Sequence, residues 1–245
     1  MRKRENVEWN LKHWLKSFLQ YKPLEETLNV RNIITSAYQD NLPFCPPYEG
    51  DLLYSLIRSN NFKACLETGL LTVSSAIYMS AAIADRDGHV TYVCLDNDQS
   101  IDQGLSLLRN AGHIGQHRLI RSNSNRAIPD LFLSGERFDL IFMDGWKTFD
   151  HLAFEMYFFN QLLRRGGIIA CDDSYMPSVR KAIRLLKRYY AFEEIDYQQH
   201  NQPFKLRIFQ ILTRRSIFRN LRAFRKREET QDQPAFRDWN FHRKL

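Results

Sequence analysis

The sequence predicts an α/β protein with a doubly wound, mostly parallel sheet of seven strands that ends in an antiparallel hairpin. Three observations predict this fold class. From residue 62 onward, short apolar runs of strand length alternate with segments of helical spacing. Glycine or acidic residues follow directly after several of these runs, as they do at the ends of parallel strands. The last two runs are separated by a short polar stretch, which leaves no room for a crossover helix.

The elements follow in order from these patterns. Helices are expected at 52–59, 74–84, 100–111, 127–133, 151–164 and 178–190. Strands are expected at 62–68, 90–95, 118–121, 138–143 and 167–171, and the two hairpin strands at 192–197 and 206–212. A loop rich in helix breakers, Pro43–Gly50, precedes the first of these helices. The sheet and its helices are therefore expected to form one domain over residues 42–213.

Residues 1–41 are expected to form a separate N-terminal helical segment. Apolar residues at helical spacing over 7–19 predict an amphipathic helix. It would pack on the domain or on a partner subunit, as in a homodimer, or lie on a membrane surface. No apolar run reaches the ~18 to 20 residues that span a bilayer, and no signal-peptide core follows the N-terminus. The cysteines show no CxxC spacing, so a reducing, cytoplasmic compartment is expected.

The basic character of the chain is concentrated in its C-terminal tail, residues 214–245. The whole chain has a net charge of +7, and the tail holds +6 of it, from ten Lys and Arg against four Asp and Glu. A helix is expected over 214–229, where Ile217, Leu221 and Phe224 would form an apolar stripe. Its cations, with aromatic residues between them, would suit phosphate contacts with nucleic acid. A solvated helix face or an oligomer contact are the alternatives.

Carboxylates follow two of the expected strands at the point where each strand ends. One apolar run ends in Asp144, with Lys147 three residues later, and the next ends in Asp172 and Asp173. In an open α/β sheet, ligands bind outside the carboxyl ends of the strands. The pattern therefore predicts a metal ion and a proton acceptor in one cleft.

The first strand-to-helix turn carries a candidate pocket for a nucleoside-like ligand. Gly69 would let the backbone approach a ligand closely, and Glu67 could accept hydrogen bonds from a ligand amine. Asp96 ends the second strand, where an acidic residue commonly binds ribose hydroxyls. Each of these residues has a plainer alternative: Gly69 could belong to a capped turn, Glu67 could be solvated, and Asp96 could cap the next helix. For the cap, however, Asp98 is better placed than Asp96. The dinucleotide fingerprint GxGxxG is absent.

With these motifs in this order, residues from about 42 to 212 resemble the class I S-adenosylmethionine-dependent methyltransferases, which have a Rossmann-like fold. The chain is most similar to the metal-dependent catechol and caffeoyl-CoA type O-methyltransferases and to related bacterial families. The stretches that carry the resemblance are Asp144-Gly-Trp-Lys147, Asp172-Asp173, Leu66-Glu-Thr-Gly69, Gly50-Asp-Leu-Leu and Leu163-Arg-Arg-Gly-Gly167.

The resemblance implies a role for each matching position. The positions that would bind S-adenosylmethionine, from its methionine end through its ribose to its adenine, are Glu67, Gly69, Ser75, Asp96, Ser124, Asn125 and Trp146. The positions that would bind a divalent cation are Asp144, Asp172 and Asp173. Mg²⁺ fits such oxygen ligands and would favour ionisation of an acceptor hydroxyl. Lys147 would be the general base, with its pKa lowered by burial or by the cation.

Two residues depart from the family pattern. Val73 stands where a second glycine is expected, and a β-branched residue resists positive φ, so cofactor binding would weaken or the loop would take another path. Asp173 stands where an asparagine is usual, which would retain a cation but add repulsion to the empty site. The plainer alternatives are that Asp172 and Asp173 cap the next helix, that Lys147 is a solvated loop lysine, and that His151 has no special role.

The sequence thus predicts an O-methyltransferase that acts on a small-molecule hydroxyl, with S-adenosylmethionine as donor and a divalent cation as helper. One alternative is a metal-independent methyltransferase of the same fold that acts on a sugar, an amine or an RNA. Another is a degenerate, non-catalytic binding protein, which Val73 favours. The N-terminal segment and the loop at 174–177 are expected to form the acceptor pocket, and neither carries a pattern that identifies the acceptor.

Overall fold

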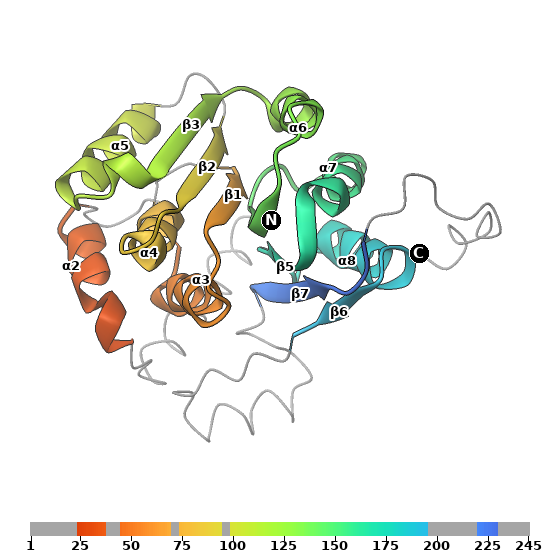
Figure 1. The fold of residues 1–245 in the computed structure, drawn as a ribbon, viewed down its shortest axis with the longest axis horizontal. Helices are drawn as coiled ribbons and strands as arrows, with labels where there is room; N and C mark the ends of the chain where they lie inside the picture. Colours follow the sequence, from red (N-terminus) through yellow and green to blue (C-terminus); the bar gives the residue numbers. More distant parts are fainter. Residues whose placement is uncertain (1–23, 38–44, 70–73, 95–98, 196–219, 230–245) are drawn as a thin grey trace, which may run out of the picture.

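The computed structural model describes residues 24–37, 45–69, 74–94, 99–195 and 220–229, and these form one sheet between two layers of helices. Within them the sheet has seven strands in the order β3-β2-β1-β4-β5-β7-β6 (Figure 1). The strands are β1 (Ala64–Thr68), β2 (His89–Cys94), β3 (His117–Arg121), β4 (Phe138–Met143), β5 (Leu163–Cys171), β6 (Phe192–Glu194) and β7 (Arg222–Lys226). Strands β1 to β5 pair in parallel, and β7 is antiparallel to both β5 and β6. The predicted doubly wound, mostly parallel sheet with an antiparallel C-terminal pair is confirmed.

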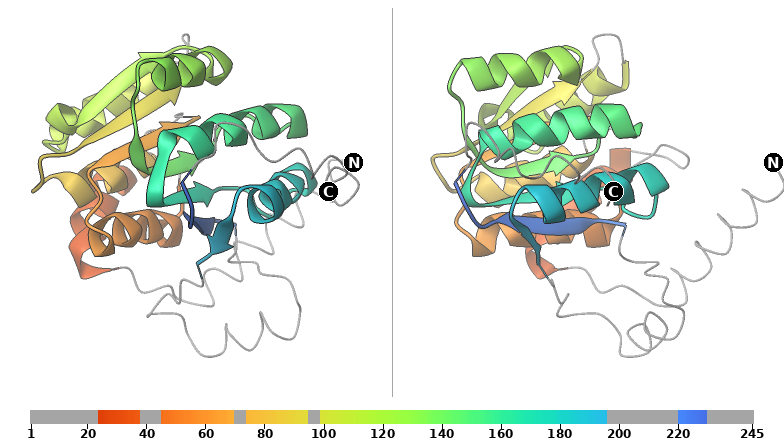
Figure 2. Two further views of the ribbon diagram at one scale, coloured as in Figure 1. Left: turned by 45° about the vertical axis from the view of Figure 1, so that its right-hand side comes forward. Right: turned by 90° about the vertical axis from the view of Figure 1, so that its right-hand side faces the viewer.

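Helices cover both faces of this sheet (Figures 1 and 2). The helices are α2 (Leu28–Ala37), α3 (Pro47–Ser59), α4 (Ser74–Ile83), α5 (Gln99–Asn110), α6 (Ser124–Leu133), α7 (Phe149–Leu162) and α8 (Pro177–Tyr189). Helices α2 to α5 pack on one face and α6 to α8 on the other. Strand side chains alternate between the two cores, so that Leu140 packs in the first and Ile141 in the second. In the described part of the chain, no helix combines the length and the apolar character needed to cross a membrane.

Helix α3 begins earlier than the sequence pattern indicates. Its first residue is Pro47, inside the segment expected to be a breaker-rich loop. Proline is well suited to the first position of a helix, because the N–H that it lacks would have no partner there. The early start places Glu49 and Gly50 on a buried helix at the edge of the candidate site. The expected amphipathic helix at 7–19 lies outside the described residues.

Strand β7 is formed by residues that were expected to belong to a tail helix over 214–229. The helix is wrong for these residues, because β7 pairs with β5 and with β6. The sheet therefore continues beyond position 213, where the domain was expected to end. The other expected hairpin strand, 206–212, lies outside the described residues, so the strand that pairs with β6 comes from later in the chain.

The apolar residues of β7 explain why a helix and a strand were both compatible with the pattern. Leu221 and Phe224 are three residues apart, which suits one face of a helix. In the structure, however, Ala223 packs in the core under α2 to α5 and Phe224 in the opposite core, which is the alternation of a strand. The free edge of β5 supplies the pairing that local spacing could not reveal.

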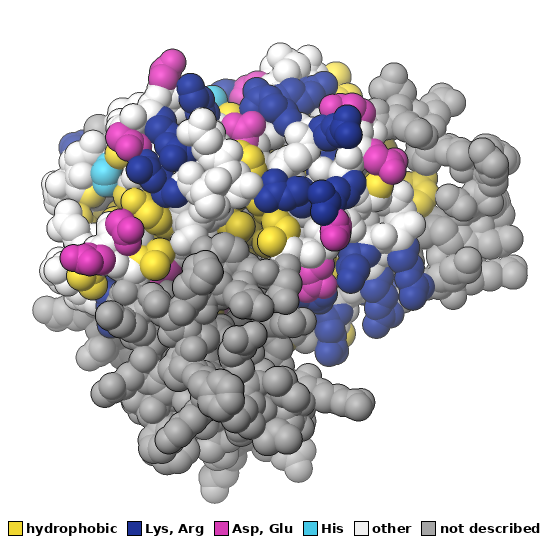
Figure 3. Space-filling view, turned by 60° about the horizontal axis from the view of Figure 1, so that its bottom comes forward, with side chains coloured by type: hydrophobic (Ala, Val, Ile, Leu, Met, Phe, Trp, Pro, Cys, Tyr) yellow, Lys and Arg dark blue, Asp and Glu magenta, His cyan; other side chains and the backbone are white. Residues whose placement is uncertain are grey.

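Three cations of the expected tail are paired within the fold. Arg222 donates to Glu194 at 2.8 and 2.6 Å, and Arg227 forms an ion pair with Glu193. Lys226 is buried, and its Nζ donates to two backbone carbonyls at the C-terminal end of α7, at 2.5 and 2.7 Å. On the face shown in Figure 3, Asp and Glu side chains lie among many of the Lys and Arg side chains, although several Lys and Arg side chains gather together at the lower right. The three paired cations of β7 and its flank favour a structural role over contact with nucleic acid.

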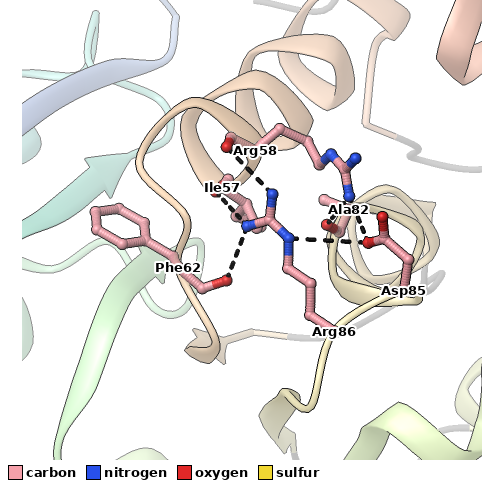
Figure 4. Close-up of polar contacts among 6 residues, drawn as sticks. All are labelled: Ile57, Arg58, Phe62, Ala82, Asp85 and Arg86. Atoms are coloured by element: carbon pink, nitrogen blue, oxygen red, sulfur yellow. Dashed lines mark hydrogen bonds and ion pairs between the residues drawn. The ribbon is translucent and has the colours of Figure 1, made fainter.

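An arginine network joins the C-terminal ends of α3 and α4 on the side where the parallel strands begin (Figure 4). Arg58 forms an ion pair with Asp85, and Arg86 Nε lies 3.8 Å from the same carboxylate. The Arg86 guanidinium also donates to the carbonyl oxygens of Ile57, Arg58 and Phe62 at 3.3 to 3.4 Å. A helix leaves its last carbonyls without intrahelical partners. The carbonyls of Ile57 and Arg58 accept the N–H groups of Phe62 and Asn61, and Arg86 adds a second donor to each.

Candidate active site

The neighbouring strands β1, β4 and β5 end side by side at the carboxyl edge of the sheet. The backbone N–H of Asp144, just after β4, donates to Thr68 O in β1 at 3.0 Å. The N–H of Asp172, just after β5, donates to Met143 O in β4 at 3.1 Å. These bonds fix the three strand ends in register, so the predicted carboxylates are brought together in one place.

Asp144, Asp172 and Asp173 form a compact acidic group. Each offers a carboxylate oxygen, and these oxygens all lie within 4.8 Å of one another. Asp173 has φ of +52°, a left-handed conformation that costs free energy for a residue other than glycine. The alternative role as a helix cap is wrong, because the N-cap of α8 is Met176 and no side chain caps that helix. Three hard oxygen donors at this spacing fit Mg²⁺ or a similar cation.

The electrostatics of the acidic group reflect its burial. Burial raises the pKa of Asp144, although Lys147 opposes the shift. Burial also raises the pKa of Asp172, and the repulsion of Asp144 and Asp173 adds to the effect. Carboxylates this close cannot all ionise cheaply unless positive charge lies between them. The group is therefore suited to bind a cation.

Lys147 lies against this acidic group rather than in solvent. Its Nζ donates to Asp144 Oδ1 at 2.9 Å and lies 3.7 Å from Asp173 Oδ2, and its side chain is 16% exposed. The interpretation as a solvated loop lysine is therefore wrong. The expected fall in its pKa is also wrong for this state: burial lowers the pKa, but the carboxylates outweigh burial and raise it. Lys147 is thus an ammonium group while the acidic group holds no other cation.

Glu67 and Ser75, which were both expected to bind the cofactor, are hydrogen-bonded to each other beside the first strand-to-helix turn. Ser75 Oγ donates to Glu67 Oε1 at 2.5 Å, and Glu67 is 1% exposed. Glu67 Oε2 is buried and has no hydrogen-bond partner among the described residues. Burial raises the pKa of Glu67 to about 8. A buried carboxylate oxygen without a donor is costly, and a ligand ammonium would relieve that cost.

Gly69 is needed for a reason that the sequence did not reveal. Its φ is +92°, and a Cβ at this position would lie 2.3 Å from the backbone oxygen of Asp144. The turn after β1 therefore packs directly against the backbone that carries the acidic group. The next residues of this turn, 70–73, include Val73 and lie outside the described residues, as does Asp96.

The residues expected at the adenine end lie on the loop after β4 and at the start of α6. Trp146 is 66% exposed, and Asn125 N–H donates to the side chain of Asn123, the N-cap of α6, at 3.3 Å. Ser124 Oγ lies 2.8 Å from Nε2 of His151. The same nitrogen lies 3.1 Å from Oε1 of Glu155, which is fully buried.

His151 therefore has a specific place at this end of the site. It holds Ser124 at the first residue of α6 and is itself held by Glu155 on α7. Sequence reasoning treated it as a histidine without a special role. Its spacing from Glu155, four residues along α7, indicates that the two share a helix face, and this was the available signal.

Sequence reasoning also missed Asn220 and Glu49. Asn220 Nδ2 lies 2.9 Å from Asp172 Oδ1 and 2.9 Å from Glu49 Oε1. The three residues come from the start of the last strand, the end of β5 and the first turn of α3. The contacts span 48 and 171 residues of sequence, and no local pattern could have predicted them.

Comparisons with known proteins agree with this geometry. A family model described as a methyltransferase domain matches residues 66–174. Tricin synthase 2 of Oryza sativa subsp. japonica is 27% identical over 169 residues, which cover 67% of this chain and 56% of the rice protein. The match thus spans little more than half the length of this curated relative.

Solved structures share the fold over nearly the whole chain. The O-methyltransferase TomG from Streptomyces achromogenes, involved in tomaymycin synthesis and solved in complex with SAM, gives a TM-score of 0.61 at 17% identity, with 89% of this chain and 96% of that chain covered. An O-methyltransferase from Bacillus cereus, solved with SAH, gives a TM-score of 0.61 at 16% identity, with 88% and 94% covered. Residues 66–174 thus match a methyltransferase domain, and the fold is the one found in O-methyltransferases solved with SAM or SAH.

Proposed function

We propose that this protein transfers a methyl group from S-adenosylmethionine to a hydroxyl oxygen of a small molecule, with a divalent cation bound by Asp144, Asp172 and Asp173. The observation that carries the proposal is the placement of Lys147, 2.9 Å from Asp144, beside an acidic group whose oxygens lie within 4.8 Å of one another. The O-methyltransferase names of the Streptomyces and Bacillus proteins support the class of reaction.

The cofactor pocket would be built around Glu67. Its unpartnered, buried Oε2 is a suitable acceptor for the ammonium of the methionine end. Trp146, exposed at the other end of the pocket, would pack on the adenine ring, with Ser124 and Asn125 beside it. Asp96 stays the predicted partner of the ribose hydroxyls. The role of the chain is then to align the acceptor oxygen, the methyl carbon and the sulfur.

Proton removal would depend on a change in the charge around Lys147. A divalent cation at the acidic group would lower the pKa of an acceptor hydroxyl and neutralise the carboxylates. Without their pull, the pKa of Lys147 would fall under the influence of burial, which already lowers it. Lys147 Nζ would then accept the hydroxyl proton as the methyl group is transferred.

The cation requirement is tested with a chelator. Methyl transfer from radiolabelled S-adenosylmethionine to a panel of small-molecule hydroxyl acceptors should fall at least ~100-fold in excess EDTA and return on addition of Mg²⁺. Full activity in EDTA would contradict the cation and favour the metal-independent alternative. Absence of S-adenosylhomocysteine binding at millimolar ligand, measured by calorimetry, would instead favour the non-catalytic alternative.

The role of Lys147 is tested by substitution. Lys147→Ala should lower turnover by ~100-fold or more, since a general base typically contributes this much, while S-adenosylhomocysteine affinity should stay within about threefold. Lys63→Ala is the matched control, because Lys63 is exposed at the opposite edge of the sheet. Equal loss of turnover and cofactor affinity in Lys147→Ala would contradict the assigned role.

A further inference from the structure

Asn220 makes contacts that the reaction above does not use. It lies two residues before the start of β7. Its side-chain amide lies between the carboxylates of Asp172 and Glu49. Nδ2 donates to Asp172 Oδ1 and to Glu49 Oε1, both at 2.9 Å. The backbone oxygen of Asn220 accepts the N–H of Ser174 at 2.8 Å. Both the side chain and the backbone of Asn220 therefore contact the loop that carries Asp172 and Asp173.

The chemistry of its neighbours fixes how this amide is turned. The NH₂ group of an amide has two donors, and here it faces Asp172 Oδ1 and Glu49 Oε1. Asn220 Oδ1 is then directed away, and it is buried without a partner among the described residues. Glu49, on α3, is 3% exposed and accepts the second hydrogen bond from Asn220 Nδ2. The orientation is therefore set by the two acidic partners together, at the cost of one unpaired oxygen.

A neutral donor at this place has a specific advantage. Asp172 is repelled by Asp144 and Asp173, and a hydrogen bond to one of its oxygens reduces that repulsion without bringing a positive charge that would compete with a cation. A lysine or arginine in the same position would compete, as Lys147 does at Asp144.

We propose that Asn220 is a positioning residue of the cation site: it holds Asp172 by a hydrogen bond from Nδ2, and Glu49 on α3 anchors the amide from behind. The inference rests on the proposed function, since it assigns Asn220 a task only if the acidic group binds a cation. Groups that orient metal ligands typically change metal affinity 10- to 100-fold when they are removed. Loss of the amide should therefore weaken cation binding without touching the cofactor pocket.

The test measures cation binding directly. Free Mn²⁺ is followed by electron paramagnetic resonance during titration of the full chain, with S-adenosylhomocysteine present. Asn220→Ala should bind Mn²⁺ about 10- to 100-fold more weakly than the unaltered protein, whereas its affinity for S-adenosylhomocysteine should stay within about threefold. Asn32→Ala, at an exposed position of α2, is the matched control and should bind Mn²⁺ like the unaltered protein. Asn220→Leu, whose side chain is similar in size to asparagine, is a second variant that removes the hydrogen bonds without leaving a cavity.

The outcomes separate this inference from the proposed function. If the unaltered protein binds no Mn²⁺, the cation part of the proposed function is overturned, and this inference with it. If the unaltered protein binds Mn²⁺ and a folded Asn220→Ala or Asn220→Leu variant binds it equally well, only the inference is overturned. A loss of cofactor affinity as large as the loss of Mn²⁺ affinity would also overturn it, because a general disturbance of the fold would explain both.

Discussion

Strand β4 has an aspartate at each end, and the two are in opposite states. Asp139, next to its first residue, accepts hydrogen bonds from the N–H groups of Lys63 and Ala64, both at 2.9 Å, and from Arg164 at 2.8 Å. Burial raises the pKa of Asp139, but these bonds outweigh it and lower the pKa below its ordinary value. Asp144, just past the last residue, lies among other carboxylates, and burial raises its pKa.

The difference separates residues that stabilise the fold from residues that are proposed to bind a ligand. At the amino edge of the sheet, Asp139 accepts from two backbone N–H groups, and Arg86 adds a donor to carbonyl oxygens at the end of α3. At the carboxyl edge, Glu67 retains an unpaired oxygen and Asp173 a left-handed backbone. Left-handed backbone also occurs at Asn61 and Ala191, so the contrast rests on the unpaired oxygen of Glu67, for which a ligand is expected to supply the missing partner.

The largest expected effect comes from the same substitution at the two ends of β4. Asp144→Asn should lower turnover by about 1,000-fold, because it removes a cation ligand and the partner of Lys147. Asp139→Asn should keep turnover within about twofold but lower the free energy of unfolding by about 2 kcal/mol, since it weakens three hydrogen bonds to a charged acceptor. Single-turnover methyl transfer and urea unfolding measure the two quantities. Similar losses of turnover in both variants would show that the two ends do not differ in function.

The second effect is a difference in pH dependence. The pKa of Glu67 is about 8 in the folded protein, against 4.5 ordinarily. In this range the folded state binds more protons than the unfolded state, so the contribution of Glu67 to stability is present at low pH and is lost as pH rises from about 4.5 to about 8. Asp139, with a lowered pKa, contributes stability above its ordinary pKa and loses it as pH falls below about 4.

Urea unfolding of the cofactor-free protein in chelator, at pH 5 and pH 8, tests this opposition. The unaltered protein should be less stable at pH 8, and Glu67→Gln should reduce that difference by on the order of 3 kcal/mol, because glutamine does not titrate. Asp144 and Asp172 should account for part of the remaining slope, since their pKa values are also raised. An unchanged slope in Glu67→Gln would show that Glu67 is ionised in the folded protein at pH 5.

A third, smaller effect concerns only the amino edge of the sheet, where Arg86 donates to backbone carbonyls. Arg86→Met should lower the free energy of unfolding by about 1 to 2 kcal/mol, because two carbonyl oxygens at the end of α3 and that of Phe62 lose the guanidinium as a donor. Turnover should be unaffected. Arg118→Met is the control: its pair with Glu136 is exposed, and such pairs contribute about 0 to 1 kcal/mol. Thermal unfolding measures both, and equal effects would show that the Arg86 bonds add nothing beyond an ordinary surface pair.

The same contrast explains what the sequence could and could not predict. Strands that end in Asp144 and Asp172 are visible because a buried strand is a local apolar run, and a carboxylate directly after it is conspicuous. Lys147 was found because it is three residues from Asp144. By contrast, the link from Asn220 to Glu49 joins residues 171 apart, and β7 depends on the free edge of β5. Pairings of this kind are set by the assembled sheet, so local spacing does not reveal them.

The smallest effect concerns the two ends of α6, each of which has a serine with a hydrogen-bonded hydroxyl. Ser124 lies beside His151 at the carboxyl edge, and Ser134 Oγ donates to Leu131 O at the opposite end of the helix. Ser124→Ala should weaken binding of S-adenosylhomocysteine about three- to tenfold, the cost of one hydrogen-bonding group near the adenine. Ser134→Ala should leave that affinity unchanged and affect only stability, by about 1 kcal/mol or less. Calorimetric titration distinguishes them. If the two variants bound S-adenosylhomocysteine equally well, Ser124 would not belong to the cofactor site. Its contact with His151 would then stabilise the fold, as the contacts at the amino edge do.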